Sequence, residues 1–151
     1  MIIAVDFDGT IVEHKYPKIG KEIPFAVETL KRLQADRHTL ILWSVREGRL
    51  LREAVEWCRA RGLEFYAVNS NHPEDFYEGE DVPTSPRKLK ADIFIDDRNV
   101  GGLPDWGVIY QIISEGLTFR DYYLNRSDES YSSGKGSFWS RLTGSGRGDR
   151  R

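Results

Sequence analysis

Cysteine is almost absent from this sequence, because Cys58 is the only one in 151 residues. A single cysteine excludes an intramolecular disulfide framework and fits a chain that folds in a reducing compartment. The neighbouring residues Ala54, Val55 and Trp57 are apolar. We therefore interpret Cys58 as an inert buried thiol rather than as a nucleophile.

Long apolar runs are also missing. The run at the amino terminus covers only residues 2–5, and no basic leader precedes it. It is too short for the core of a signal peptide or for a helix that spans a membrane. We therefore expect a soluble, cytoplasmic protein that has no membrane partner.

Neither sign of charge is in large excess. The chain has 22 Lys and Arg residues against 24 Asp and Glu residues, which gives a formal net charge of −2. This balance provides no electrostatic argument for a nucleic-acid or membrane partner, and we find no specific nucleic-acid motif. Any charge that binds phosphate must therefore be local. The length suits one domain with a core of its own.

Short apolar segments of the strand type alternate with amphipathic segments of helical spacing. The expected strands are residues 2–5, 39–43, 63–68, 92–95 and 108–110. The expected helices are one that starts at Pro24, one at 48–61, one that starts at 84–86 and one at 117–124. This alternation predicts an open, three-layer Rossmann-like α/β fold with a mostly parallel central sheet. In such folds ligands bind at the carboxyl ends of the strands.

Two stretches interrupt the alternation. Residues 69–87 are rich in Asn, Pro and Gly, and we expect a long loop there. Residues 125–151 are rich in Ser, Gly and Arg and poor in apolar residues, which predicts a disordered tail after a domain at 1–124. The tail's Phe138 and Trp139 either remain free or dock onto this subunit, a neighbouring subunit or another protein.

Two carboxylates follow the first expected strand. Asp6 and Asp8 are two residues apart, so on an extended chain they project from the same face, and Gly9 allows a tight turn beside them. Like charges this close are costly unless a cation neutralises them, and Mg²⁺ prefers such oxygen ligands. The alternative for this short pattern alone is a solvated, Asp-rich turn.

Other polar side chains follow the later strands. Ser44 comes directly after 39–43, Asp96 and Asp97 come directly after 92–95, and Lys88 lies shortly before that strand. Parallel strands place their carboxyl ends at one edge of the sheet, so these groups should gather there. Acids, a hydroxyl group and a lysine are the residue types that phosphoryl transfer needs.

In this order the residues resemble the haloacid dehalogenase superfamily of phosphohydrolases. Residues 6–10, Asp-Phe-Asp-Gly-Thr, are similar to the first motif of that family, Ser44 to the second and Lys88 to the third. Residues 95–99, Ile-Asp-Asp-Arg-Asn, are similar to the fourth motif. The stretch 88–99, with Pro-Asp-Trp-Gly at 104–107, resembles a subgroup of small, capless members, and the resemblance covers residues 1–124. In two respects the sequence departs from the pattern: Ser stands where Thr is frequent, and Lys90 competes with Lys88.

The resemblance implies a Mg²⁺-dependent phosphatase that acts through an aspartyl-phosphate. Asp6 would be the nucleophile, and Asp8 would be the general acid and base. Ser44 and Lys88 would hold phosphoryl oxygens. The metal ligands would be Asp6, the backbone carbonyl of Asp8, and Asp96, with Asp97 as a further ligand or a support.

Four more residues are candidates for binding the phosphorylated substrate: Gly9, Thr10, Arg46 and Asn69. For Arg46 there are two alternatives. Its guanidinium makes a two-point contact with a phosphate or carboxylate of the substrate, or it forms a surface salt bridge with Glu47 or another acid. Asn69 either lines the pocket or serves the turn after the third strand. We interpret Trp43 as a core residue and His14 as a solvated loop residue.

The insertions after the first and third strands are short, so we expect no cap domain. An open site suits a macromolecular phosphate, or a small metabolite or nucleotide enclosed by a second subunit of a homo-oligomer. Two other classes remain as alternatives. One is a receiver-like phosphorylation switch, whose phosphorylated aspartate would follow a middle strand at the place where this chain has Val68 and Asn69. The other is a catalytically idle binding module.

Overall fold

The structure is a computed structural model, and it describes residues 1–73 and 89–124. The chain divides into two compact units, Met1–Tyr110 and Gln111–Arg151. Four of the predictions lie wholly or mostly outside the described residues: the long loop at 69–87, of which only 69–73 are described, the helix start at 84–86, Lys88 and the disordered tail at 125–151.

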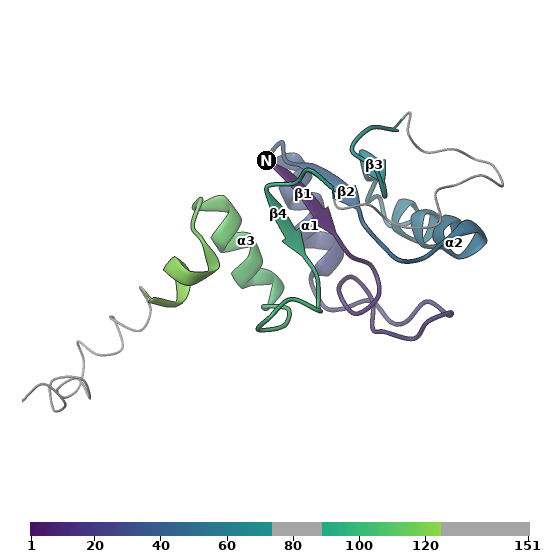
Figure 1. Cartoon of the computed structure of the whole chain (residues 1–151), viewed down its shortest axis with the longest axis horizontal. Coiled ribbons are helices and arrows are strands. Elements are labelled where there is room, and N and C mark those ends of the chain that lie inside the picture. The colour runs from purple at the N-terminus through teal and green to yellow at the C-terminus, as the bar shows by residue number, and fades with distance from the viewer. Residues whose placement is uncertain (74–88, 125–151) are drawn as a thin grey trace, which may run out of the picture. The chain divides into compact units, whose positions relative to one another are not determined.

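The first unit is built on a four-stranded sheet with the strand order β3-β2-β1-β4 (Figure 1). The strands are β1 (Ile2–Val5), β2 (Thr39–Leu42), β3 (Ala67–Val68) and β4 (Ile93–Ile95). Every pairing between them is parallel. The structure therefore confirms the predicted Rossmann-like α/β fold, and its described residues contain no cap domain.

The described residues form the helices α1 (Ala26–Ala35), α2 (Gly48–Arg59) and α3 (Trp106–Ser114). The crossovers through α1 and α2 both step from β1 toward β3 across the sheet, so right-handed connections place these two helices on the same face. Cys58 on α2 is fully buried, and burial raises the pKa of its thiol to about 12. Cys58 is therefore a core residue, as predicted.

The core uses both faces of the sheet, as parallel strands require. Ile3 and Leu40 belong to one set of alternating side chains and are almost completely buried. Ala4 and Ile41 belong to the other set and pack with Leu89, which follows the undescribed segment. The central strands β1 and β2 are therefore covered from both sides, which fixes the height at which their carboxyl ends stop.

Two of the predicted strands are wrong in extent or type. Residues 108–110 lie inside α3, because Trp106, Ile109 and Ile113 recur at helical spacing and are all buried. A short apolar run does not distinguish a strand from one turn of a buried helix. The predicted strand at 63–68 shrinks to β3, since the N–H of Leu63 bonds to the carbonyl of Cys58 and closes the end of α2.

The described part of the second unit is helical. The last residues of α3 are followed by a turn, and residues 119–124 form the helix predicted at 117–124. Thr118 and Asp121 cap it, because the Thr118 hydroxyl donates to the Asp121 carboxylate and accepts from the Asp121 N–H. In the parts of the chain described here, no helix combines the length and the apolar character needed to cross a membrane.

The stability of the first unit should depend on the packing of β2. Leu42 is completely buried, so Leu42→Ala leaves a cavity and is expected to lower the free energy of unfolding by about 2–5 kcal/mol. Urea denaturation followed by circular dichroism measures the loss. Val100→Ala, at a fully exposed position, is the control and should change stability little. Equal effects of the two variants would contradict this account of the core.

Candidate active site

A cavity of about 290 Å³ lies at the carboxyl ends of β1, β2 and β4. Four of the residues predicted for the site line it: Asp6, Asp8, Ser44 and Asp96. Its wall also includes five residues that the sequence did not identify as site residues: His14, Tyr16, Trp43, Val45 and Arg98. The strand ends thus bring together polar groups that are up to 90 residues apart in the sequence.

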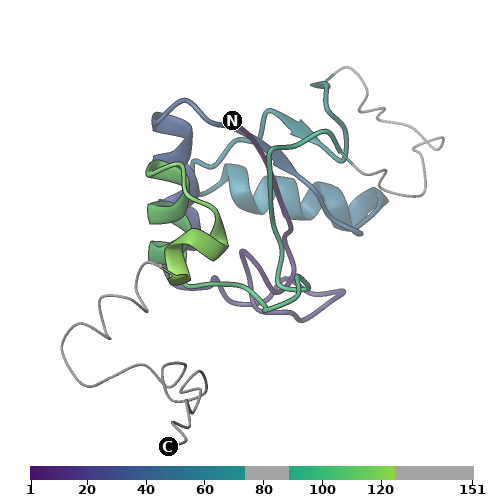
Figure 2. The same ribbon diagram turned by 60° about the vertical axis from the view of Figure 1, so that its left-hand side comes forward.

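The register of the sheet explains this convergence. Val5 pairs with Leu42 on one side and with Ile95 on the other, so all three strands stop at the same level. The N–H of Asp6 continues the pairing, donating to the carbonyl of Ile95 at 2.9 Å. Figure 2 shows the segments that follow β1 and β4 side by side at this edge.

Asp6, Asp96 and Asp97 form an acidic cluster. One carboxylate oxygen from each lies within 4.8 Å of the other two. Asp97 Oδ1 is buried and has no hydrogen-bond donor among the described residues. A buried, unpartnered carboxylate oxygen beside two further acids is the environment that a cation would complete.

Asp6 has a raised pKa in this cluster. Burial raises the pKa of its carboxyl group to about 7, and repulsion from Asp96, Asp97 and Asp8 acts in the same direction. A hydrogen bond from the Phe7 backbone opposes the rise. Without a cation, ionising Asp6 near neutral pH is therefore costly.

Gly9 and Thr10 lie against the acidic cluster. Thr10 is fully buried, and its hydroxyl accepts the Asp97 N–H at 3.1 Å and donates to Asp6 at 3.4 Å. Gly9 has a φ of 92°, and a Cβ there would lie 2.3 Å from the carboxylate of Asp97. Neither residue lines the cavity. Thr10 thus contacts both Asp6 and Asp97 and Gly9 borders Asp97, while their predicted role in substrate binding stays a prediction.

Asp8 is in a different environment from Asp6. Both of its carboxylate oxygens accept hydrogen bonds from Arg46, at 2.6 Å from Nε and 2.7 Å from an Nη. The chain turns sharply after the strand, since the carbonyl of Phe7 accepts the N–H groups of Ile11 and Val12. Both acids thus line one cavity, and of the two only Asp8 has a cationic partner among the described residues.

Arg46 is completely buried and does not line the cavity. Of the two alternatives for Arg46, a salt bridge with an acid of the chain is present, but the acid is Asp8 and the pair is buried rather than at the surface. The other alternative, a two-point contact with a substrate anion, would need this guanidinium to leave Asp8. Sequence reasoning placed Arg46 near the site but could not identify its partner.

Ser44 and Asn69 are joined across two strand ends. The Asn69 side chain accepts the N–H of Ser44 and donates to its carbonyl, both at 2.8 Å. Asn69 itself has a φ of 51°, and its side chain does not line the cavity. Of the two roles considered for Asn69, the structure favours the turn, in which it also holds the backbone of Ser44.

The additional lining residues come from predictable places. Trp43 and Val45 flank Ser44, Arg98 is two residues after Asp96, and His14 and Tyr16 lie on the loop that leaves the acidic strand end. Trp43 is only part of the core, because it packs on Phe94 and also faces the cavity. For Trp43, Val45 and Arg98 the available signal was their position beside a motif residue, and for His14 and Tyr16 it was their place on the loop that follows the first motif.

Comparison with known proteins finds a solved structure that is similar to this chain. The chain is similar to a conserved protein from Bacteroides thetaiotaomicron, with 69% sequence identity and a TM-score of 0.72, over 82% of this chain and 97% of that one. The chain belongs to the same family as that protein. No protein-family model and no curated protein matches this sequence.

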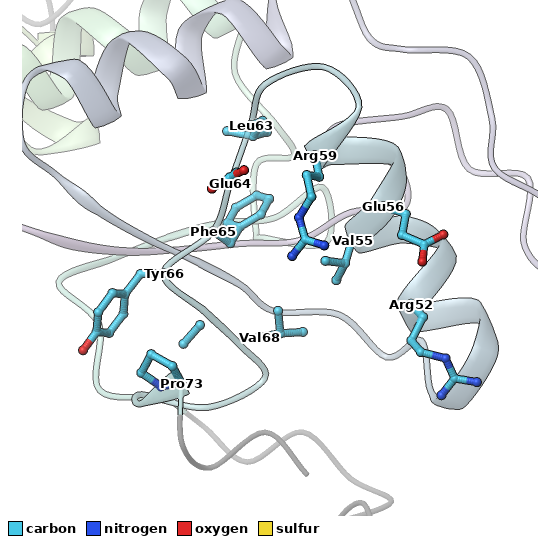
Figure 3. A pocket seen from close by; sticks show the side chains of 11 residues that line it. Arg52, Val55, Glu56, Arg59, Leu63, Glu64, Phe65, Tyr66, Val68 and Pro73 are labelled. Carbon is cyan, nitrogen blue, oxygen red and sulfur yellow. The ribbon is translucent and has the colours of Figure 1, made fainter. Parts of the chain in front are cut away.

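A second cavity of about 290 Å³ lies between α2 and the segment that leads into β3 (Figure 3). Arg52, Glu56 and Arg59 from α2 line it, opposite the segment that contains Phe65 and Tyr66. It contains none of the predicted site residues. Of the two cavities, the first is therefore the one that contains predicted site residues.

The raised pKa of Asp6 predicts that the stability of the fold depends on pH. The carboxyl group of Asp6 has a pKa of about 7 in the folded chain, whereas its ordinary pKa, which applies in the unfolded chain, is 3.8. The contribution of Asp6 to the free energy of unfolding therefore has its full value below pH 3.8 and falls as the pH rises to about 7. The total decrease is on the order of 4 kcal/mol. With a chelator present, Asp6→Asn should stabilise the protein more at pH 8 than at pH 5.

Thermal unfolding at the two pH values measures this difference. Glu28→Gln makes the same carboxylate-to-amide change on the exposed face of α1 and is the control. A stability difference between Asp6→Asn and the wild type that does not change with pH would contradict the burial argument.

Proposed function

We propose that this chain is a Mg²⁺-dependent phosphomonoester hydrolase of the haloacid dehalogenase type that acts through an aspartyl-phosphate intermediate. The observation that carries the proposal is the meeting of Asp6, Asp8, Ser44 and Asp96 around one cavity. These groups come from three strand ends, in the order that the sequence motifs require. Their roles follow from their surroundings.

The donor set fits a hard divalent cation. Asp6, Asp96 and Asp97 offer carboxylate oxygens within 4.8 Å of one another, and Asp97 Oδ1 has no donor among the described residues. These three carboxylates, with the backbone carbonyl of Asp8, would hold Mg²⁺. When bound, the ion supplies positive charge that offsets the repulsion between an anionic phosphate and the carboxylates.

Asp6 is the nucleophile in this proposal. Its carboxylate attacks phosphorus in line, so that a bond forms between Asp6 and phosphorus while the bond to the leaving oxygen breaks. Asp8 protonates the leaving oxygen and then takes a proton from the water that hydrolyses the aspartyl-phosphate. Ser44, held by Asn69, binds a phosphoryl oxygen. Lys88, which lies outside the described residues, is proposed to bind another.

The strand order supports a hydrolase over a receiver-like switch. A receiver would need its phosphorylated aspartate after a middle strand, whereas here β3 is an edge strand and Asn69 follows it. The Asn69 side chain is bonded to the backbone of Ser44. The acids follow β1 and β4 instead, and β1 is central.

Gly9→Ala tests the metal site by geometry. The added Cβ would lie 2.3 Å from Asp97 Oδ2 at a φ that side chains disfavour, so Asp97 must move. Mg²⁺ should then raise the melting temperature of the variant less than that of the wild type. Gly116→Ala also has a positive φ but has open space around it, and it serves as the control. Equal Mg²⁺-induced shifts in Gly9→Ala and the wild type would contradict the proposed ligand set.

The direct test of the function is release of phosphate from p-nitrophenyl phosphate. We expect turnover that requires Mg²⁺, stops in excess chelator and falls by at least about 1000-fold in Asp6→Asn, because no nucleophile remains. Glu28→Gln should keep full activity. Turnover that survives Asp6→Asn or excess chelator would exclude this mechanism.

A further inference from the structure

Arg46 is the most completely buried charged side chain among the described residues, with no exposed surface at all. Its guanidinium makes two hydrogen bonds to Asp8, through Nε at 2.6 Å and an Nη at 2.7 Å. Such a two-point contact fixes the plane of a carboxylate as well as its position. Asp8 is therefore held in one orientation at the wall of the cavity.

The same guanidinium also binds the loop that follows the acidic strand end. Its two Nη atoms donate to the carbonyls of Pro17 at 3.1 Å and Lys18 at 2.9 Å. The rings of Phe7 and Tyr16 lie 5.3 and 5.4 Å from its central carbon. Four hydrogen bonds and two aromatic contacts therefore converge on one side chain.

We refer to residues 13–21 as the 13–21 loop. Its base is closed by the backbone, because the N–H of Glu13 bonds to the carbonyl of Lys21 at 2.7 Å and Val12 pairs with Glu22. Its tip bonds to Arg46 through Pro17 and Lys18. Between base and tip it carries His14 and Tyr16, which line the cavity.

Arg46 thus connects two walls of the cavity, the carboxylate of Asp8 and the 13–21 loop. We propose that Arg46 is a positioning residue that holds Asp8 and the 13–21 loop as one unit and does not itself bind the phosphate. The inference rests on the proposed phosphatase function for the role of Asp8. Its structural half, the attachment of the loop, does not depend on that function.

The burial of Arg46 decides which substitution is informative. Arg46→Ala would leave the buried carboxylate of Asp8 and two carbonyls without partners, and the chain could fail to fold. Arg46→Lys keeps the positive charge but loses the fork, since an ammonium group cannot make the planar two-point contact. Arg49→Lys is the matched control, because Arg49 pairs with Glu53 on the exposed surface of α2.

The test is a double-mutant cycle on kcat with p-nitrophenyl phosphate and Mg²⁺. Arg46→Lys should lower kcat by about 10- to 100-fold and change KM less, because a misplaced reacting group costs this much. In an Asp8→Asn background the same substitution should have almost no further effect, because Asp8 is already disabled. Arg49→Lys should leave kcat unchanged.

Multiplicative losses in the double variant would overturn the proposal, because Arg46 would then act independently of Asp8. A large rise in KM with an unchanged kcat would overturn it as well, since that pattern indicates that Arg46 binds the substrate in its ground state. If the wild type releases no phosphate at all, the proposed function fails, and the loop attachment is decided by the second measurement.

The second measurement is limited digestion with trypsin, with the cut sites identified by mass spectrometry. Lys15, Lys18 and Lys21 are exposed on the 13–21 loop. Cleavage there should be at least about threefold faster in Arg46→Lys than in the wild type or Arg49→Lys, because the tip has lost its anchor. Loop cleavage at the wild-type rate in folded Arg46→Lys would overturn the proposal.

Discussion

The parallel alignment of three strand ends is the constraint on which the site depends. Val5 is in register with both Leu42 and Ile95, so β1, β2 and β4 stop together and their following residues share one edge. Core packing on both faces of β1 and β2 prevents these strands from sliding. Asp6, Ser44 and Asp96 are close because their strands cannot end anywhere else.

Concentrating acids at one edge creates an electrostatic problem that the chain resolves in two ways. Asp8 is neutralised from within, by a buried arginine that approaches from the end of β2. Asp6, Asp96 and Asp97 receive no such partner among the described residues. Burial, together with repulsion from the neighbouring acids, raises the pKa of Asp6. Asp8 therefore has a fixed cationic partner within the chain, whereas the environment of Asp6 favours a bound cation.

The sequence was informative wherever a local pattern carries its own geometry. Residues 2–5 and 39–42 are β-branched and apolar enough to be buried strands, and the polar residues directly after them could be placed at the sheet edge in advance. It was misleading where a pattern is shared by two structures, as in the run at 108–110, which fits either a strand or a turn of α3. The length of β3 was overestimated for a related reason, since Leu63 completes the end of α2 before the strand begins.

By itself, the sequence determined the fold class, the level of the sheet at which the polar residues stand and the residue types available there, because all three follow from periodicity and position along the chain. Only the tertiary structure decided which group each side chain contacts. Arg46 looked like a surface or substrate-binding residue and is a buried partner of Asp8, 38 positions away. Thr10 was predicted to bind substrate, and Asn69 either to line the pocket or to serve a turn; their side chains bond to the backbones of Asp97 and Ser44. Partners this distant in sequence are selected by the folding of the strands and the 13–21 loop around them, and no local pattern records that choice.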